Sequence, residues 1–357
     1  MRLLPSGTFH ESYRSDHALW QWRTGFTRVA LAAAAVALVG LLPSYSSGYV
    51  LGVANVLGYT ILSALGVQLL IGYCGQVTLG HAAFIAVGAY GTGIGILQYG
   101  LPYPVALAVG ALLAGGWSVL FGLPSARTKG FYLIMTTMAA QFVTVDFVIA
   151  QYVSQIGGRG VAFSLPPGTI RMGTLVVDTE RETYYLMLIL VALCTAGVIN
   201  LFRTRIGRAW IAIRDNDVAA EALGVNIFRY KLLAFFVAGV LGGIAGGFWV
   251  SANYGLTPED YTLAWSLWLV GVILIGGVGS VHGVFFGAAF LTVILEVLKA
   301  LVFTLADAYP MLNDRFLFVK EMAFGVAIIG FLLYQPRGLA YRWQQIKTYF
   351  KLWPFGY

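Results

Sequence analysis

The stretch LLAFFVAGVLGGIAGGFWVS, from Leu232 to Ser251, carries no charged side chain and is long enough to cross a bilayer as a helix. Gly239, Gly243 and Gly247 follow one another at four-residue spacing, so they fall on nearly the same side of that helix. Bare backbone on one side lets a second helix approach closely. The stretch therefore predicts a transmembrane helix that packs against other helices.

The composition extends this prediction to the whole chain. Hydrophobic residues make up 59% and charged residues 10%, whereas soluble proteins average roughly 45–50% and about 25%. The 357 residues suffice for about ten helical spans with short loops. A β-barrel is excluded because the apolar runs do not alternate with polar residues. The expected spans are Thr27–Leu42, Gly48–Gly72, Leu79–Leu97, Tyr103–Leu123, Phe131–Ala150, Tyr184–Phe202, Leu232–Ser251, Leu263–Gly277, Val284–Phe303 and Leu317–Leu333.

Alternating spans place most Lys and Arg residues on one side of the membrane. That side holds Arg2, Arg14, Arg23, Arg28, Arg127, Lys129, Arg203, Arg205, Arg208, Arg214, Arg229, Lys231, Arg337, Arg342, Lys347 and Lys351. The other side holds only Arg159, Arg171, Arg181 and Arg315. By the positive-inside rule, both termini are cytoplasmic. The cations border the membrane and form no single patch, so we expect no nucleic-acid partner.

This orientation divides the chain into three expected parts. Residues 1–26 form a cytoplasmic N-terminal lead and residues 336–357 a cytoplasmic tail. Residues 27–335 form the transmembrane domain, which includes a cytoplasmic loop at 203–231 and a periplasmic loop at 152–183.

Two segments interrupt apolar runs with similar glycine, hydroxyl and histidine residues. They are GYCGQVTLGHAAF, from Gly72 to Phe84, and GGVGSVHGVFFGAAF, from Gly276 to Phe290. Paired glycine-interrupted segments indicate a translocation pathway, although tight turns between helices also require glycine. The candidate pathway residues are Gly75, Thr78, Gly80, His81, Gly277, Ser280 and His282.

The sequence lacks the common catalytic motifs. It contains no HExxH pair, no GxSxG elbow and no Gly-Lys dipeptide of a phosphate-binding loop. Cys74 and Cys194 have no metal-ligand spacing and are expected to be packing residues, and no metal site is expected. Glu296 and Lys299 are three residues apart in one span and can partly neutralise each other, so a coupling-ion role for Glu296 stays open.

The segment RAWIAIRDNDVAAEALGVN, from Arg208 to Asn226, is charged and helix-forming. On one helix, Ile211, Val218 and Ala222 would form a stripe beside a second stripe of Arg214, Asp217 and Glu221, and Gly224 suits the C-terminal stop. A helix lying on lipid headgroups prefers Lys and Arg. The mixture of acids and bases instead indicates a protein partner.

Several ordered motifs resemble one known family. EALGVNIFRYKLLAFFVAG resembles the coupling loop of bacterial ABC importer permeases, which docks on the ATPase. From about Val50 to Leu339, the segments GQVTLGHAAF, RTKGFYLIMTT, IGRAWIAIRDND, GGVGSVHG and YQPRGL resemble, in this order, the M-type permease of branched-chain (hydrophobic) amino acid importers. SQIGGRGVAFSLPP departs from the family's T-G-G-x-x-G pattern, which leaves the substrate open.

The resemblance implies an all-α polytopic protein of the bacterial inner membrane, with about ten transmembrane helices, some interrupted by glycine, and a cytoplasmic coupling helix. It implies a heterodimer with an H-type permease, two ABC ATPase subunits and a periplasmic substrate-binding protein. This chain would hold no cofactor, because the ATPases bind ATP and Mg. The residues expected to couple to the ATPase are Arg214, Asp217, Glu221, Ala222 and Gly224.

The resemblance leaves the cargo open among branched-chain or other hydrophobic amino acids, urea or short amides, and aromatic carboxylates. A secondary carrier or channel that works alone is the rival class, but it has no evident need for an acidic coupling helix. A membrane enzyme is disfavoured because no nucleophile and base occur at a recognisable spacing.

Overall fold

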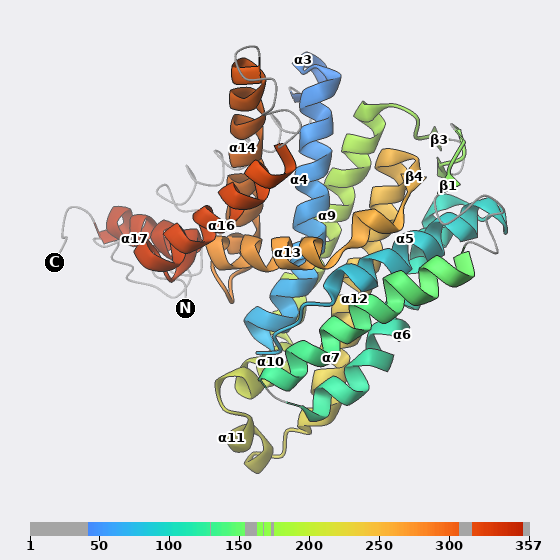
Figure 1. The fold of residues 1–357 in the computed structure, drawn as a ribbon. Coiled ribbons are helices and arrows are strands. Elements are labelled where there is room, and N and C mark those ends of the chain that lie inside the picture. Colours follow the sequence, from blue (N-terminus) through green and yellow to red (C-terminus); the bar gives the residue numbers. More distant parts are fainter. Residues whose placement is uncertain are drawn as a thin grey trace, which may run out of the picture.

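A computed structural model describes residues 42–128, 130–153, 163–166, 168–172, 175–306 and 316–352 (Figure 1). The expected N-terminal lead and, apart from Leu42, the first expected span at Thr27–Leu42 lie outside these residues. Residues 154–162, 167, 173 and 174 of the expected periplasmic loop and residues 353–357 of the C-terminal tail also lie outside the described part of the chain.

The described chain is almost entirely helical. Its helices are α3 (Leu42–Tyr45), α4 (Gly48–Val67), the π-helix η2 (Gln68–Tyr73), α5 (His81–Leu97), α6 (Tyr103–Arg127), α7 (Phe131–Phe142), the π-helix η3 (Val143–Val153), α9 (Glu180–Arg203), α10 (Arg205–Asp215), α11 (Asp217–Ala222), α12 (Ile227–Asn253), the 3-10 helix η4 (Pro258–Tyr261), α13 (Leu263–Gly276), α14 (Val281–Ala306), α16 (Phe316–Tyr334) and α17 (Gly338–Leu352). Two antiparallel pairs of two-residue strands join β1 (Phe163–Ser164) to β4 (Gly255–Leu256), and β2 (Arg171–Met172) to β3 (Leu175–Val176).

Six helical segments among the described residues are long and apolar enough to cross a membrane. They are Gly48–Tyr73, Tyr103–Pro124, Phe131–Gln151, Glu180–Arg203, Ile227–Asn253 and Val281–Thr304. The expectation of about ten spans is therefore not confirmed over this part of the chain.

Two of the expected spans are apolar helices that stop short. α5 has 17 residues and α13 has 14. At 1.5 Å per residue they reach about 26 Å and about 21 Å, against a hydrocarbon core of about 30 Å. One glycine-rich turn precedes α5 and the other follows α13, and these turns limit the two helices at those ends. The expected last span falls on the 19-residue helix α16, which is not among the six segments above.

The core surrounds α12, which packs on α5 and α6 as the glycine spacing predicted. A Cβ added to Gly243 would lie 2.7 Å from Cα of Ala111, in α6. A Cβ on Gly246 would collide with the Ile85 carbonyl of α5. Helix backbones touch at these points, so side chains larger than glycine have no space.

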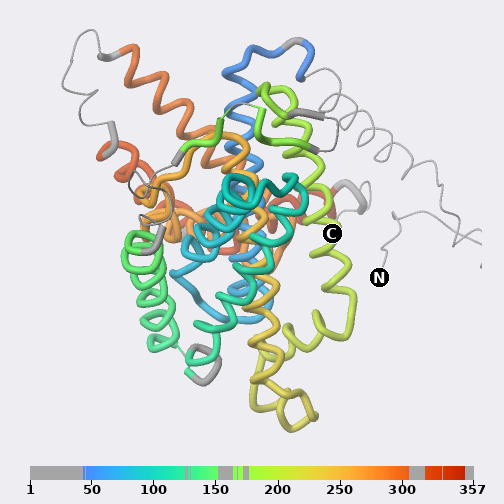
Figure 2. The backbone as a smooth tube through the Cα atoms, turned by 90° about the vertical axis from the view of Figure 1, so that its right-hand side faces the viewer, coloured from blue at the N-terminus to red at the C-terminus, as the bar shows by residue number. Residues whose placement is uncertain are grey.

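The two ends of α12 lead to different structures. Its first residue follows α10 and α11, which lie together at one end of the molecule (Figures 1 and 2). At the other end Tyr254 adopts a left-handed conformation (φ 52°) and ends the helix. There β4 pairs with β1, and the amide of Leu165 donates to the Tyr254 carbonyl at 2.7 Å. The described part of the 152–183 loop thus lies opposite the 203–231 loop.

Candidate functional site

The first glycine-rich segment is a turn between η2 and α5. Gly75 has a φ of +70°, which favours glycine, and the chain stays non-helical until α5 begins at His81. Thr78 is buried, and its hydroxyl accepts from the Gly80 amide at 3.3 Å. A Cβ on Gly80 would collide with the Thr137 carbonyl of α7. The predicted candidates of this segment therefore lie in one packed turn.

Side chains from other helices satisfy the free amides at the start of α5. The Ala82 amide donates to the Ser266 hydroxyl at 2.9 Å, and the Ala83 amide donates to Oε1 of Gln141 at 2.8 Å. The first amides of a helix have no partner within the helix, so these contacts fix the end of α5 to α13 and α7. Neither Ser266 nor Gln141 is marked by a sequence motif.

The second segment is a turn between α13 and α14. Gly277 and Gly279 have φ values of +120° and +80°. The Ser280 hydroxyl accepts from the Gly283 amide at 3.3 Å and so caps the start of α14. Both segments thus form turns between helices, and their place in a translocation pathway stays a prediction.

The two histidines occupy different environments. His81 is 1% exposed, and a Cβ on Gly66 of α4 would lie 2.6 Å from its Nε2. On its other side, a Cβ on Gly242 of α12 would lie 3.2 Å from the same atom. His282 is exposed on α14. The similarity in sequence therefore does not extend to the placement of the histidines.

Gln68, at the start of η2, attaches this helix to the second turn. Its Nε2 donates to the Gly277 carbonyl at 3.2 Å and to the Ser280 carbonyl at 2.9 Å. Gln68 is 1% exposed and lies one helical turn before Gly72. Sequence reasoning missed this residue, although an amide within an otherwise apolar run was a usable signal.

The segment predicted as one coupling helix is two helices, which corrects that expectation. Asn216 is extended (φ −160°, ψ 105°) between α10 and α11, and its Oδ1 accepts from the Ala219 amide at 3.0 Å. Asparagine is a favoured N-cap because its side chain replaces the missing helical acceptor. The break separates Arg214 from Asp217 and Glu221, so the three residues do not form one continuous stripe.

The predicted stop at Gly224 is confirmed. Gly224 has a φ of +87°, and its amide donates to the Glu221 carbonyl at 2.9 Å. The Val225 amide donates to the Ala220 carbonyl at 3.0 Å. This pair of bonds is the Schellman motif, which ends helices at a left-handed glycine.

α10 is attached to the membrane domain, whereas α11 is largely exposed. Trp210 is fully buried, and its indole Nε1 donates to the Tyr230 carbonyl at 2.8 Å, at the start of α12. Val218, on α11, is 69% exposed, and Leu223, the residue after the last residue of α11, is 84% exposed. Glu221 and Ala222 are exposed beside them. α11 thus offers an apolar and acidic surface.

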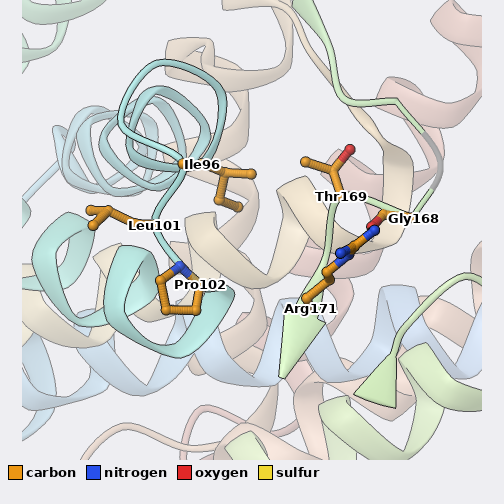
Figure 3. Close-up of a pocket in the computed structure, with 7 residues that line it drawn as sticks. Ile96, Leu101, Pro102, Gly168, Thr169 and Arg171 are labelled. Atoms are coloured by element: carbon orange, nitrogen blue, oxygen red, sulfur yellow. The ribbon is translucent and has the colours of Figure 1, made fainter. Parts of the chain in front are cut away.

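A hollow lies at the opposite end of the molecule, between the α5–α6 connection and the strand β2 (Figure 3). Its volume is about 490 Å³. Nε of Arg171 donates to the Gly168 carbonyl at 3.0 Å, so its guanidinium folds back along the loop. The lining residues are Ile96, Gly100, Leu101, Pro102, Gly168, Thr169 and Arg171, none of which was a predicted pathway residue. Among the described residues, no group of three His, Cys, Asp or Glu side chains is placed to hold a metal ion.

Comparison with known proteins gives a family match over most of the chain. Residues 49–334 match the model of the branched-chain amino acid transport system permease component. The chain is 28% identical over 261 residues to the high-affinity branched-chain amino acid transport system permease protein LivM of Escherichia coli (strain K12), covering 67% of this chain and 61% of LivM. It is 24% identical over 253 residues to the probable LivM of Methanocaldococcus jannaschii, covering 69% of each chain.

A relative named for a different cargo matches a longer stretch of the chain. The autoinducer 2 import system permease protein LsrC of Enterobacter sp. (strain 638) is 29% identical over 274 residues, which covers 73% of this chain and 75% of LsrC. The similarity to LivM, in contrast, spans only 61% of the length of the LivM proteins of Escherichia coli and Salmonella typhimurium. No solved structure matches the chain.

Proposed function

Because the chain belongs to the family of branched-chain amino acid transport system permease components, we propose that it is the translocation subunit of an ABC importer for branched-chain or other hydrophobic amino acids. The match over residues 49–334 carries this proposal, because it includes the apolar helices, both glycine turns and the α10–α11 segment. The subunit is not itself an enzyme. ATP and Mg bind to partner subunits, whose hydrolysis drives the movement.

The exposed surface of α11 supports docking on an ATPase subunit. Val218 and Leu223 are large, exposed apolar side chains at one end of the molecule, and the exposed Glu221 lies between them in the sequence. An apolar patch with a charged rim is typical of a protein interface. α11 is joined to α9 through α10 and to α12 directly, so force on it reaches two long helices.

The remaining partners and the orientation are part of the same proposal. A second, H-type permease completes the translocation pathway, and a periplasmic substrate-binding protein delivers the cargo to the end that carries β1 and β4. The lysines and arginines around α10 and α11 favour a cytoplasmic position for that end and for both termini, in a bacterial inner membrane.

Uptake by the reconstituted importer tests the cargo. The complex with its ATPases and binding protein, in proteoliposomes, is expected to take up radiolabelled leucine only with ATP, and unlabelled isoleucine is expected to compete. The LsrC relative makes autoinducer 2 the second candidate cargo. If autoinducer 2, urea or benzoate inhibits the uptake of leucine and isoleucine does not, the amino acid assignment is contradicted.

Glu221→Lys tests the docking role of α11. Reversal of an interfacial charge can cost several kcal/mol, so we expect at least about tenfold weaker association with the ATPase and loss of substrate-stimulated hydrolysis. Glu259→Lys, at an exposed position in η4 at the other end, is the matched control for charge reversal and should retain association with the ATPase. Stoichiometric ATPase with full stimulated turnover in Glu221→Lys would exclude the docking role.

A further inference from the structure

We infer that Arg214 is a positioning residue that fastens the coupling segment to both glycine turns, so that movement of α10 acts on η2 and on the α13–α14 turn together. The inference rests on the proposed function, because it concerns how ATPase movement reaches the membrane helices. It differs from the role that the sequence indicated for Arg214, which was contact with the ATPase itself.

The guanidinium points into the chain's own membrane domain. Nη1 of Arg214 donates to the Gly72 carbonyl at 2.8 Å. Asp215 orients the group, because its Oδ1 accepts from Nε at 2.9 Å and from Nη2 at 2.8 Å. The Arg214 side chain is 35% exposed, and that of Asp215 is 61% exposed. All three nitrogens of the planar guanidinium donate hydrogen bonds, and these bonds fix its orientation.

Both turns approach Arg214, the first along its aliphatic stem and the second at its guanidinium. A Cβ on Gly279 would lie 3.1 Å from Nη1 of Arg214 and 3.3 Å from the Gly72 carbonyl oxygen. A Cβ on Gly75 would lie 3.1 Å from Cγ of Arg214. A Cβ on Gly72 would lie 2.7 Å from the Gly279 amide nitrogen. The glycines thus open the space in which α10 meets both turns.

Electrostatics favours a cation at this point. Gly72 is in the last turn of η2, where carbonyls lack helical partners and the helix carries partial negative charge. An arginine satisfies such a carbonyl and complements that charge, with a charge-assisted bond that is stronger than a neutral one.

The surrounding contacts make a continuous path from α11 to the turns. Asn216 joins α11 to α10, and Trp210 and Arg214 attach α10 to the start of α12 and the end of η2. Gln68 then ties η2 to the Gly277 and Ser280 carbonyls. α10 is therefore attached at two points, and Asn216 lies between its attached end and the exposed α11.

Arg214→Gln removes the charge and the fork, and Arg214→Lys retains the charge with a single donor group. Arg208→Gln is the matched control, because Arg208 is exposed on the same helix. Each variant is purified in the complete importer. In Arg214→Gln we expect the ATPase to remain bound but the amino acid transported per ATP hydrolysed to fall at least about tenfold. Arg214→Lys should be intermediate and Arg208→Gln unchanged.

Hydrogen exchange of the complex provides a readout that does not depend on transport. Amides of residues 72–80 and 277–283 should exchange faster in Arg214→Gln, and in Arg214→Lys if the first variant does not accumulate, than in Arg208→Gln. Unchanged exchange at both turns, or a transport ratio equal to the parent's, overturns the inference. Loss of the ATPase from Arg214→Gln also overturns it, because Arg214 would then belong to the docking interface. Failure of the proposed function is recognised separately, by a parent complex that takes up no amino acid.

Discussion

His81 and His282 each follow a glycine-rich turn at the start of a helix, but His81 is 1% exposed and His282 is exposed. His81 is held between Gly66 and Gly242, on two helices that both pack in the core. His282 lies on α14, which with α16 and α17 occupies the side of α13 opposite to α5, α6 and α7 (Figure 1).

The difference shows that similar residue types in two turns need not have equal roles. The first turn lies among α4, α7, α12 and α13, so changes there should act on stability. The second turn is held by contacts to its backbone: Gln68 donates to its carbonyls, and a Cβ on Gly338 of α17 would lie 2.5 Å from Cα of Gly277. Side-chain changes on its outer surface should therefore be tolerated.

The largest effect is expected from Gly243→Leu, in the core where α12 packs on α6. Its Cβ would meet Cα of Ala111 at 2.7 Å and Cβ of Ala114 at 2.8 Å, and backbone cannot give way cheaply. Overpacking of this kind should cost about 3 kcal/mol, at the upper end of the usual range. Gly330→Leu in α16 is the control, because a Cβ there meets nothing within 4 Å. Thermal unfolding in detergent measures both, and a Gly243→Leu variant as stable as the control would place Gly243 against lipid.

A smaller effect separates the two histidines directly. His81→Trp adds volume where Gly66 and Gly242 leave none, so the free energy of unfolding should fall by about 2 kcal/mol. His282→Trp changes an exposed position and should stay within about 0.5 kcal/mol of the parent. The same unfolding measurement applies. Equal losses in the two variants would show that the turns are equivalent after all.

Hydropathy and glycine spacing predicted much of this fold, but not where every helix stops. The runs that became α6 and α12 are long and continuous, and the four-residue spacing of Gly239, Gly243 and Gly247 correctly predicted close packing. α5 and α13 are equally apolar but short. A window of hydropathy cannot distinguish a crossing helix from a short one enclosed by others, because both lack charges.

The candidate site was predicted less completely, because its contacts join distant parts of the chain. The preference of asparagine for N-caps could have predicted the break at Asn216. A stripe on a helix does not say which side faces a partner, so the inward direction of Arg214 could not be read from its position. The contact between Gln68 and Gly277 could not be predicted either, because the two residues are 209 positions apart in the sequence.

The last prediction perturbs the molecule least and tests on which side of the membrane both turns lie. Thr204, between α9 and α10, is exposed near the turns, and Glu259 is exposed in η4 at the other end of α12. Single cysteines at these surface positions should change stability by less than about 0.5 kcal/mol. The background replaces Cys74 and Cys194 by alanine, because both thiols, although buried, could react slowly.

Spheroplasts treated with a membrane-impermeant maleimide should label Glu259→Cys, and Thr204→Cys should react only after the membrane is opened. The expectation follows from the positive-inside rule, since the loop around Thr204 is rich in arginine. The Arg214 bond to Gly72 fixes that loop beside both turns. Labelling of Thr204→Cys from outside would therefore show that the turns and the coupling segment lie on the periplasmic side. An ATPase in the cytoplasm could not then reach α11, and the docking role and the Arg214 inference would fail together.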